Sequence, residues 1–224
     1  MKDNFSFSPE QYAKYRPDYP AAIFDFIYPL LNEKSVAWDC GTGNSQVAQE
    51  LAHDFDRVEA TGISMQQIQY AFETPNIHYS VQPAEQTNFA DNTFDLITVA
   101  QAVHWFDIEK FNTEVKRVGK PGGIIALIGY ELNTITPEID RIIRHFYTNI
   151  IGSYWDPERQ HIQNRYQLIS FPYREWETPE INNIKLCKYD YLIGYLNTWS
   201  AVRHFMVKNN YNPISEIEAE LREA

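Results

Sequence analysis

The stretch AWDCGTGNSQ (residues 37–46) joins a short apolar run to a helical pattern through two glycines that stand one residue apart. Glycine lets the backbone take left-handed conformations and approach a ligand closely. The third glycine of the dinucleotide pattern G-x-G-x-x-G is replaced by Gln46, and no phosphate-loop string G-x-x-x-x-G-K-[ST] occurs in the chain. By itself the stretch fits either a ligand-binding turn or a tight strand-to-helix turn without a ligand.

Strand and helix patterns alternate on both sides of this turn, over residues 35–131. Such alternation predicts an α/β fold with a parallel sheet that helices cover on both faces. The N-terminal residues 1–34 are aromatic and proline-rich and end in a first helix. Residues 132–224 read as mostly helical, with long helices at 136–151 and 191–207 and one candidate strand near 184–189.

Composition and charge limit the classes of partner. The chain has 224 residues, a formal net charge of −11, and two cysteines that form no CxxC motif. Excess negative charge disfavours binding to phosphate backbones, so we expect no nucleic-acid partner. Neither a signal peptide nor a bilayer-spanning stretch is evident, which predicts a cytoplasmic protein without a membrane partner. Histidine and cysteine spacing indicates no metal site.

Three strings in a fixed order identify a resemblance: WDCGTGNSQ (38–46), AEQTNFADNTFDLITVAQAVHWFD (84–107) and EVKRVGKPGG (114–123). With them, the chain resembles class I S-adenosylmethionine-dependent methyltransferases. It is most similar to the small-molecule branch typified by trans-aconitate methyltransferase-like proteins, which also share YRPDYP (15–20) and GYLNTWSAV (194–202). The resemblance implies a Rossmann-like, doubly wound, mostly parallel sheet, the cofactor S-adenosyl-L-methionine, and methyl transfer to a carboxylate or hydroxyl of a small organic molecule.

The resemblance also implies which residues hold the cofactor. They follow the ends of successive strands or belong to an N-terminal lid, and they are Arg16, Asp39, Gly41, Thr42, Gly43, Gln46, Gly62, Ile63, Ser64, Ala84, Glu85, Ala100 and Gln101. Asp39 is expected either to engage the amino-acid part of the cofactor or to brace the loop. Ser45 stands where another glycine is usual, and we expect it to cap the following helix.

Gly62 is the main departure from the family pattern. The second strand usually ends in an acid whose carboxylate takes both ribose hydroxyls, and losing such a bond costs about 1.5–3 kcal/mol. Water or Ser64 is expected to recover part of this loss. Gly62 therefore favours, as an alternative function, a ligand-binding module with weak or lost catalysis.

Other residues are candidates for the acceptor side. His104 lies just beyond the fourth strand and is either a general base or a histidine packed by Trp105 at a helix start. Arg16 is expected to meet a carboxylate of the cofactor or of an acidic substrate, or else to form a surface salt bridge. The remaining lid and pocket candidates are Tyr12, Tyr15, Trp105, Trp155 and Trp199; the aromatic residues after the fifth strand either line a substrate pocket or pack a helical subdomain.

The family sheet normally has seven strands with an antiparallel pair at its end. No segment after Pro213 has a strand pattern, so we expect the final antiparallel strand to be missing. An uncovered sheet edge invites pairing with another chain, which predicts a tendency to form a homodimer or to aggregate. Methylation of protein or RNA remains a third possible function, and the charge argues against RNA.

Overall fold

Five parallel strands form the sheet, in the order β3-β2-β1-β4-β5. The computed structural model describes residues 9–224, so the first eight residues of the expected lid lie outside the described residues. The strand bounds are β1 (Val36–Cys40), β2 (Arg57–Gly62), β3 (Ile77–Val81), β4 (Phe94–Ala100) and β5 (Gly119–Ile128). This arrangement confirms the predicted Rossmann-like sheet between residues 35 and 131.

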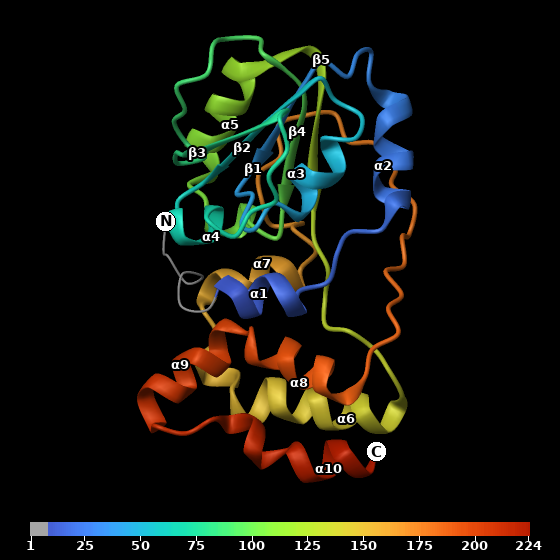
Figure 1. Ribbon diagram of the computed structural model, residues 1–224, viewed down its shortest axis with the longest axis vertical. Coiled ribbons are helices and arrows are strands. Elements are labelled where there is room, and N and C mark those ends of the chain that lie inside the picture. Colours follow the sequence, from blue (N-terminus) through green and yellow to red (C-terminus); the bar gives the residue numbers. More distant parts are fainter. Residues whose placement is uncertain (1–8) are drawn as a thin grey trace.

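Helices cover both faces of the sheet (Figure 1). Side chains alternate along a strand, so Ala37 and Trp38 of β1 enter different cores. Ala37 packs with residues of α2 (Ala21–Ile27) and α3 (Gln46–Leu51) on one face. Trp38 packs against Phe111 of α5 (Ile108–Val118) on the other face. The short α4 (Met65–Ile68) follows β2.

A helical cap forms the second half of the molecule and has a core of its own, with Ile143, Phe146, Leu196 and Trp199 fully buried (Figure 1). Helix α1 (Pro9–Tyr15) lies between the cap and the sheet. The cap elements are α6 (Pro137–His145), η3 (Phe146–Ile150), η4 (Gly152–Tyr154), η5 (Pro157–Arg159), α7 (Gln160–Gln163), α8 (Tyr189–Asn197), α9 (Ser200–Asn209), η6 (Pro213–Glu216) and α10 (Glu218–Glu223).

Two predictions for the cap are wrong. The candidate strand at 184–189 is irregular chain over 184–188 and enters α8 at Tyr189; Ile184 and Leu186 are 88% and 99% exposed, because the segment runs through solvent. The expected helix over 191–207 is divided into α8 and α9 at Thr198, because burial of Trp199 turns the chain there. Over residues 9–224, no antiparallel strand completes the sheet, as predicted.

No helix in the described part of the chain has both the length and the apolar character needed to cross a bilayer.

Candidate functional site

A cavity of about 70 Å³ lies where the carboxyl ends of β1, β2, β3 and β4 meet α1. In an open α/β sheet this crevice is the usual ligand site, at the point where the strand order reverses, here between β1 and β4. The cavity is lined by Tyr12, Gly41, Gly43, Gly62, Ile63, Gln67, Gln82, Ala84, Ala100, Gln101, Ala102, Trp105 and Phe106. The sequence predicted nine of these thirteen residues.

The glycine turn requires its two glycines for different reasons. Gly41 has φ +75°, and a Cβ there would stand 2.7 Å from the Cβ of Ala102. Gly43 has φ +56°, but the nearest atom to a Cβ would be Gln67 Nε2 at 3.9 Å. The backbone N–H groups of Gly41 and Thr42 both donate to the carbonyl of Thr61, at 2.9 and 2.8 Å. The turn is thus fastened to the end of β2.

Ser45 does not cap α3 through its side chain, contrary to expectation. It adopts a left-handed conformation with φ +72°, which glycine would tolerate better. Its hydroxyl instead accepts a hydrogen bond of 2.7 Å from the backbone N–H of Phe72. This bond ties the glycine turn to the chain after α4.

Asp39 braces the loop and does not line the cavity. Its carboxylate accepts hydrogen bonds from the Thr42 hydroxyl at 2.6 Å, the Thr98 hydroxyl at 3.0 Å and the Ala48 N–H at 3.1 Å. Burial raises the pKa of Asp39 to about 6, although these three bonds oppose the shift. Of its two expected roles, the structure shows loop bracing, and Thr42 shares that role.

Three predicted cofactor residues are engaged in local structure instead of facing the cavity. The Ser64 hydroxyl caps α4 by accepting from the N–H of Gln67 at 3.2 Å. The Glu85 carboxylate accepts from the N–H of Asp107 at 2.9 Å, before α5. Gln46 donates its amide to the carbonyls of Arg16 and Pro17, at 3.2 and 3.3 Å. Gln46 therefore holds the lid against the core.

The lid arginine connects three parts of the molecule. Arg16 donates to the Tyr130 hydroxyl after β5 at 3.0 Å and to the Thr198 carbonyl in the cap at 3.1 Å. Its guanidinium lies over the rings of Tyr12 and Tyr195, at 4.8 and 5.6 Å from their centroids. Among the described residues no carboxylate pairs with it, and the expected surface salt bridge is not formed. Arg16 packs against Tyr12, is half-buried, and does not line the cavity.

His104 is buried next to the cavity wall without lining it. Its ring packs on Trp105, with centroids 4.8 Å apart, and stacks at 6.3 Å with Tyr166. Burial, with a further contribution from the Arg159 charge, lowers the pKa of His104 to about 3. The imidazole is therefore neutral at physiological pH and a weak base.

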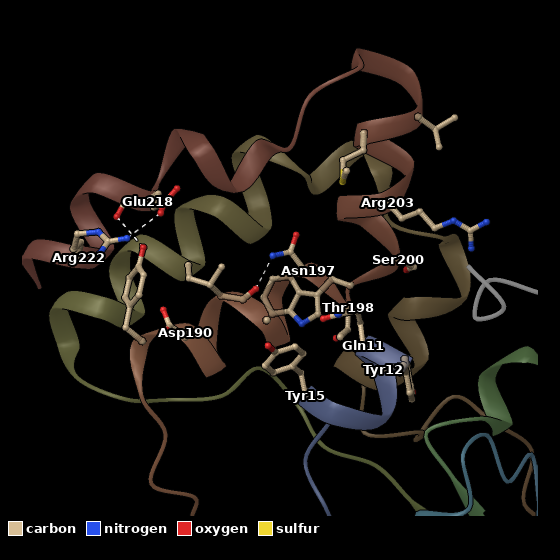
Figure 2. A pocket seen from close by; sticks show the side chains of 16 residues that line it. Gln11, Tyr12, Tyr15, Asp190, Asn197, Thr198, Ser200, Arg203, Glu218 and Arg222 are labelled. Carbon is tan, nitrogen blue, oxygen red and sulfur yellow. Dashed lines mark hydrogen bonds and ion pairs between the residues drawn. The ribbon is translucent and has the colours of Figure 1, made fainter. Parts of the chain in front are cut away.

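A second cavity, of about 720 Å³, lies within the cap and is closed on one side by α1. Figure 2 shows Tyr12 and Tyr15 of α1 facing Thr198 and Ser200, with Arg203 and Arg222 toward opposite ends of the view. Trp199 contributes to this lining but is almost fully buried, and Trp155 packs beside it in the cap core. Neither tryptophan lines the sheet-side cavity, and Trp199 lines the cap cavity instead.

Sequence reasoning missed Gln67, Gln82, Ala102 and Phe106. Ala102 and Phe106 follow β4 within the same string that identified the family, so their position was a usable signal. Gln82 is held by Ser80 and by the N–H of Asn88, at 2.7 and 2.8 Å. Nothing in the sequence marks Gln67 as a cavity residue, because polar residues are common in short surface helices.

The lining fits S-adenosyl-L-methionine. A left-handed glycine turn, small residues at the ends of β3 and β4, and the aromatic rings of Trp105 and Phe106 allow close approach of a flat, polar ligand. The present volume is below the roughly 300–1,000 Å³ usual for ligand pockets, and Tyr12 of α1 is part of its wall. Over residues 9–224, no three acidic, histidine or cysteine side chains gather to hold a metal ion.

Comparisons with known proteins agree with this geometry. Residues 38–127 match the family described as a methyltransferase domain. A protein of Dictyostelium discoideum named as a methyltransferase is 32% identical over 99% of this chain and 86% of its own length.

Two solved structures are similar as well. One, named as a type II methyltransferase, comes from Anaeromyxobacter dehalogenans and has a TM-score of 0.85 at 35% identity, covering 93% of this chain and 89% of that one. Another, from Methanococcus maripaludis and named as dependent on S-adenosyl-L-methionine, has a TM-score of 0.53 at 18% identity, covering 75% and 84%, and supports the fold alone. The chain therefore belongs to the class I S-adenosylmethionine-dependent methyltransferases.

Proposed function

We propose that the protein transfers the methyl group of S-adenosyl-L-methionine to a carboxylate of a small organic acid. One observation carries this choice of acceptor. Within the described chain, Tyr12 is the one ionisable side chain among the cavity-lining residues. Burial raises the pKa of Tyr12, which keeps the phenol neutral. The lining therefore offers no group that would remove a proton near neutral pH.

A carboxylate acceptor needs no such group. The cofactor supplies an activated methyl on a sulfonium, so the protein chiefly aligns the acceptor oxygen and excludes water. An ionised carboxylate attacks directly, whereas a hydroxyl benefits from a general base. His104 is the nearest candidate base, but its pKa of about 3 makes it inefficient.

Size and charge favour a small anionic acceptor over a macromolecule. The cavity is small, about 70 Å³, and Tyr12 of α1 and Trp105 form part of its wall. Arg16 adds a positive charge directly behind Tyr12, without a described carboxylate to neutralise it. Arg16 is half-buried, and its charge attracts an anion in the neighbouring cavity even though the residue does not line it. The net charge of −11 opposes binding of RNA.

The first test is calorimetric titration with S-adenosyl-L-methionine and S-adenosylhomocysteine, for which we expect micromolar binding. Absence of binding up to millimolar ligand would contradict the proposal and would favour a ligand-binding module that has lost its cofactor.

The second test identifies the acceptor. Labelled cofactor is incubated with small carboxylic acids, phenols, whole-cell protein and RNA. We expect label in the acids, as methyl esters that release methanol in mild alkali, and a kcat that is flat from pH 6 to 9. Alkali-stable label in phenols, with a kcat that rises with pH and is lost in His104→Asn, would instead assign His104 as a base.

A further inference from the structure

The end of β2 supplies no carboxylate to the cavity. Gly62 lines the cavity, and a Cβ there would meet only the Thr42 Cγ2, at 3.9 Å, so the space is open. The nearest acid in sequence, Glu59, is three residues upstream and pairs with Arg57 at 3.4 Å. In dinucleotide-binding sheets an acid near this strand end binds the ribose hydroxyls. Some other group must bind a ribose placed here.

Two neighbouring polar side chains are already engaged. Ser64 caps α4, and both ends of the Gln82 amide are bonded, to the Ser80 hydroxyl and to the N–H of Asn88. Using either one for a ligand would break an existing hydrogen bond. Such a loss cancels most of what the new bond contributes.

Gln67 differs from both. The residue is 8% exposed, and its side chain lines the cavity and forms no hydrogen bond with any side chain or backbone group of residues 9–224. Its Nε2 lies over the glycine turn, 3.9 Å from the position of a Cβ on Gly43. The Ser64 cap fixes the start of α4, which directs Gln67 inward while Met65 and Gln66 stay exposed. A ligand in the cavity can therefore bind the Gln67 amide without breaking a hydrogen bond within the described residues.

We propose that Gln67 binds the ribose hydroxyls of the cofactor in place of the missing acid at Gly62. A side-chain amide has one acceptor oxygen and an NH2 group with two donor hydrogens, so it can both accept a hydrogen bond from one ribose hydroxyl and donate one to the other. This inference rests on the proposed use of S-adenosyl-L-methionine. It makes Gln67 a cofactor-specificity residue that a search for acidic residues would overlook.

The test is calorimetric binding of S-adenosylhomocysteine to wild type, Gln67→Met and Gln69→Met. Methionine preserves the volume of glutamine, and Gln69 is an exposed residue at the end of the same helix, which makes it a matched control. We expect Gln67→Met to bind about tenfold more weakly, and Gln69→Met to bind like wild type. Circular dichroism confirms that each variant is folded.

Cofactor analogues test the same contact without any substitution. The 2′-deoxy or the 3′-deoxy analogue of S-adenosylhomocysteine should bind wild type about tenfold more weakly than the parent compound. Gln67→Met should bind that analogue and the parent equally. Undiminished binding by Gln67→Met, or equal loss with the analogue in both proteins, would overturn the assignment to Gln67 alone. No binding by wild type would overturn the proposed function and this inference with it.

Discussion

Asp39 is a buried carboxylate whose charge opposes folding. Its pKa of about 6 exceeds the ordinary 3.8 because burial disfavours the ionised form. Between about pH 4 and 6, the folded chain keeps a proton that the unfolded chain has lost, so the contribution of Asp39 to stability falls as the pH rises through this window. The loss is at most about 3 kcal/mol.

Asp39→Asn removes this titration. The unfolding free energy of the variant minus that of wild type should rise by up to about 3 kcal/mol from pH 4 to pH 7. Altered hydrogen bonds in the variant add a cost that does not change with pH. Urea unfolding of both proteins at each pH measures this difference in unfolding free energy. The other titratable groups are shared by the two proteins, so their contributions drop out when one value is subtracted from the other. A difference between the two proteins that stays constant with pH would contradict the raised pKa.

The two glycines of the turn should respond differently to alanine. Gly43→Ala introduces only left-handed strain, about 1–2 kcal/mol, because no atom lies closer than 3.9 Å to the new Cβ. Gly41→Ala adds overlap with the Ala102 Cβ and should cost about 1–3 kcal/mol more. Urea unfolding compares the variants. Adding Ala102→Gly should remove the extra cost from Gly41→Ala, and a failure to do so would place the clash elsewhere.

Among the elements, α1 connects the sheet to the cap, and Gly194 of α8 gives it room. A Cβ on Gly194 would overlap the ring of Tyr15, while alanine itself favours a helix over glycine by about 1 kcal/mol. Gly194→Ala should therefore leave α8 intact but push α1 away. We expect faster amide hydrogen exchange over residues 10–16 and unchanged exchange in α8.

Gly152→Ala is the matched control for this effect, since its nearest neighbour to a new Cβ is the Tyr147 carbonyl at an ordinary 3.6 Å. Equal exchange in the two variants would show that α1 does not depend on Gly194.

Sequence reasoning succeeded where local patterns decide the structure. The alternating strands and helices predicted all five strands, and the family resemblance placed Gly41, Gly43, Ala84 and Gln101 at the cavity. Sequence reasoning failed where a contact with a residue distant in the sequence determines the position of a side chain. Gln46 was expected to face the cofactor, but its amide binds the backbone of a lid that lies about thirty residues earlier.

The cap shows the same limit. Nothing in the local pattern of 191–207 indicates that Trp199 is buried against Phe146 and Tyr147, and this burial divides the helix.

At the scale of the whole molecule, β5 leaves one edge of the sheet without a strand partner among residues 9–224. The Ile128 carbonyl accepts from the N–H of Gln101 after β4, and backbone groups of alternate residues point the same way. Ile124, Ala126 and Ile128 therefore face β4, while the N–H groups of Ile125 and Leu127 face the open edge. Unpaired edge groups of this kind favour pairing with a second copy.

We expect the mass from light scattering to rise with concentration from 26.3 kDa toward twice that value. Ile125→Pro removes one outward N–H and leaves the hydrogen bonds to β4 in place, since proline is tolerated on an edge strand. The variant should stay folded by circular dichroism and remain monomeric at concentrations where wild type associates. A wild-type chain that is monomeric throughout would show that side chains or the returning chain of the cap protect this edge.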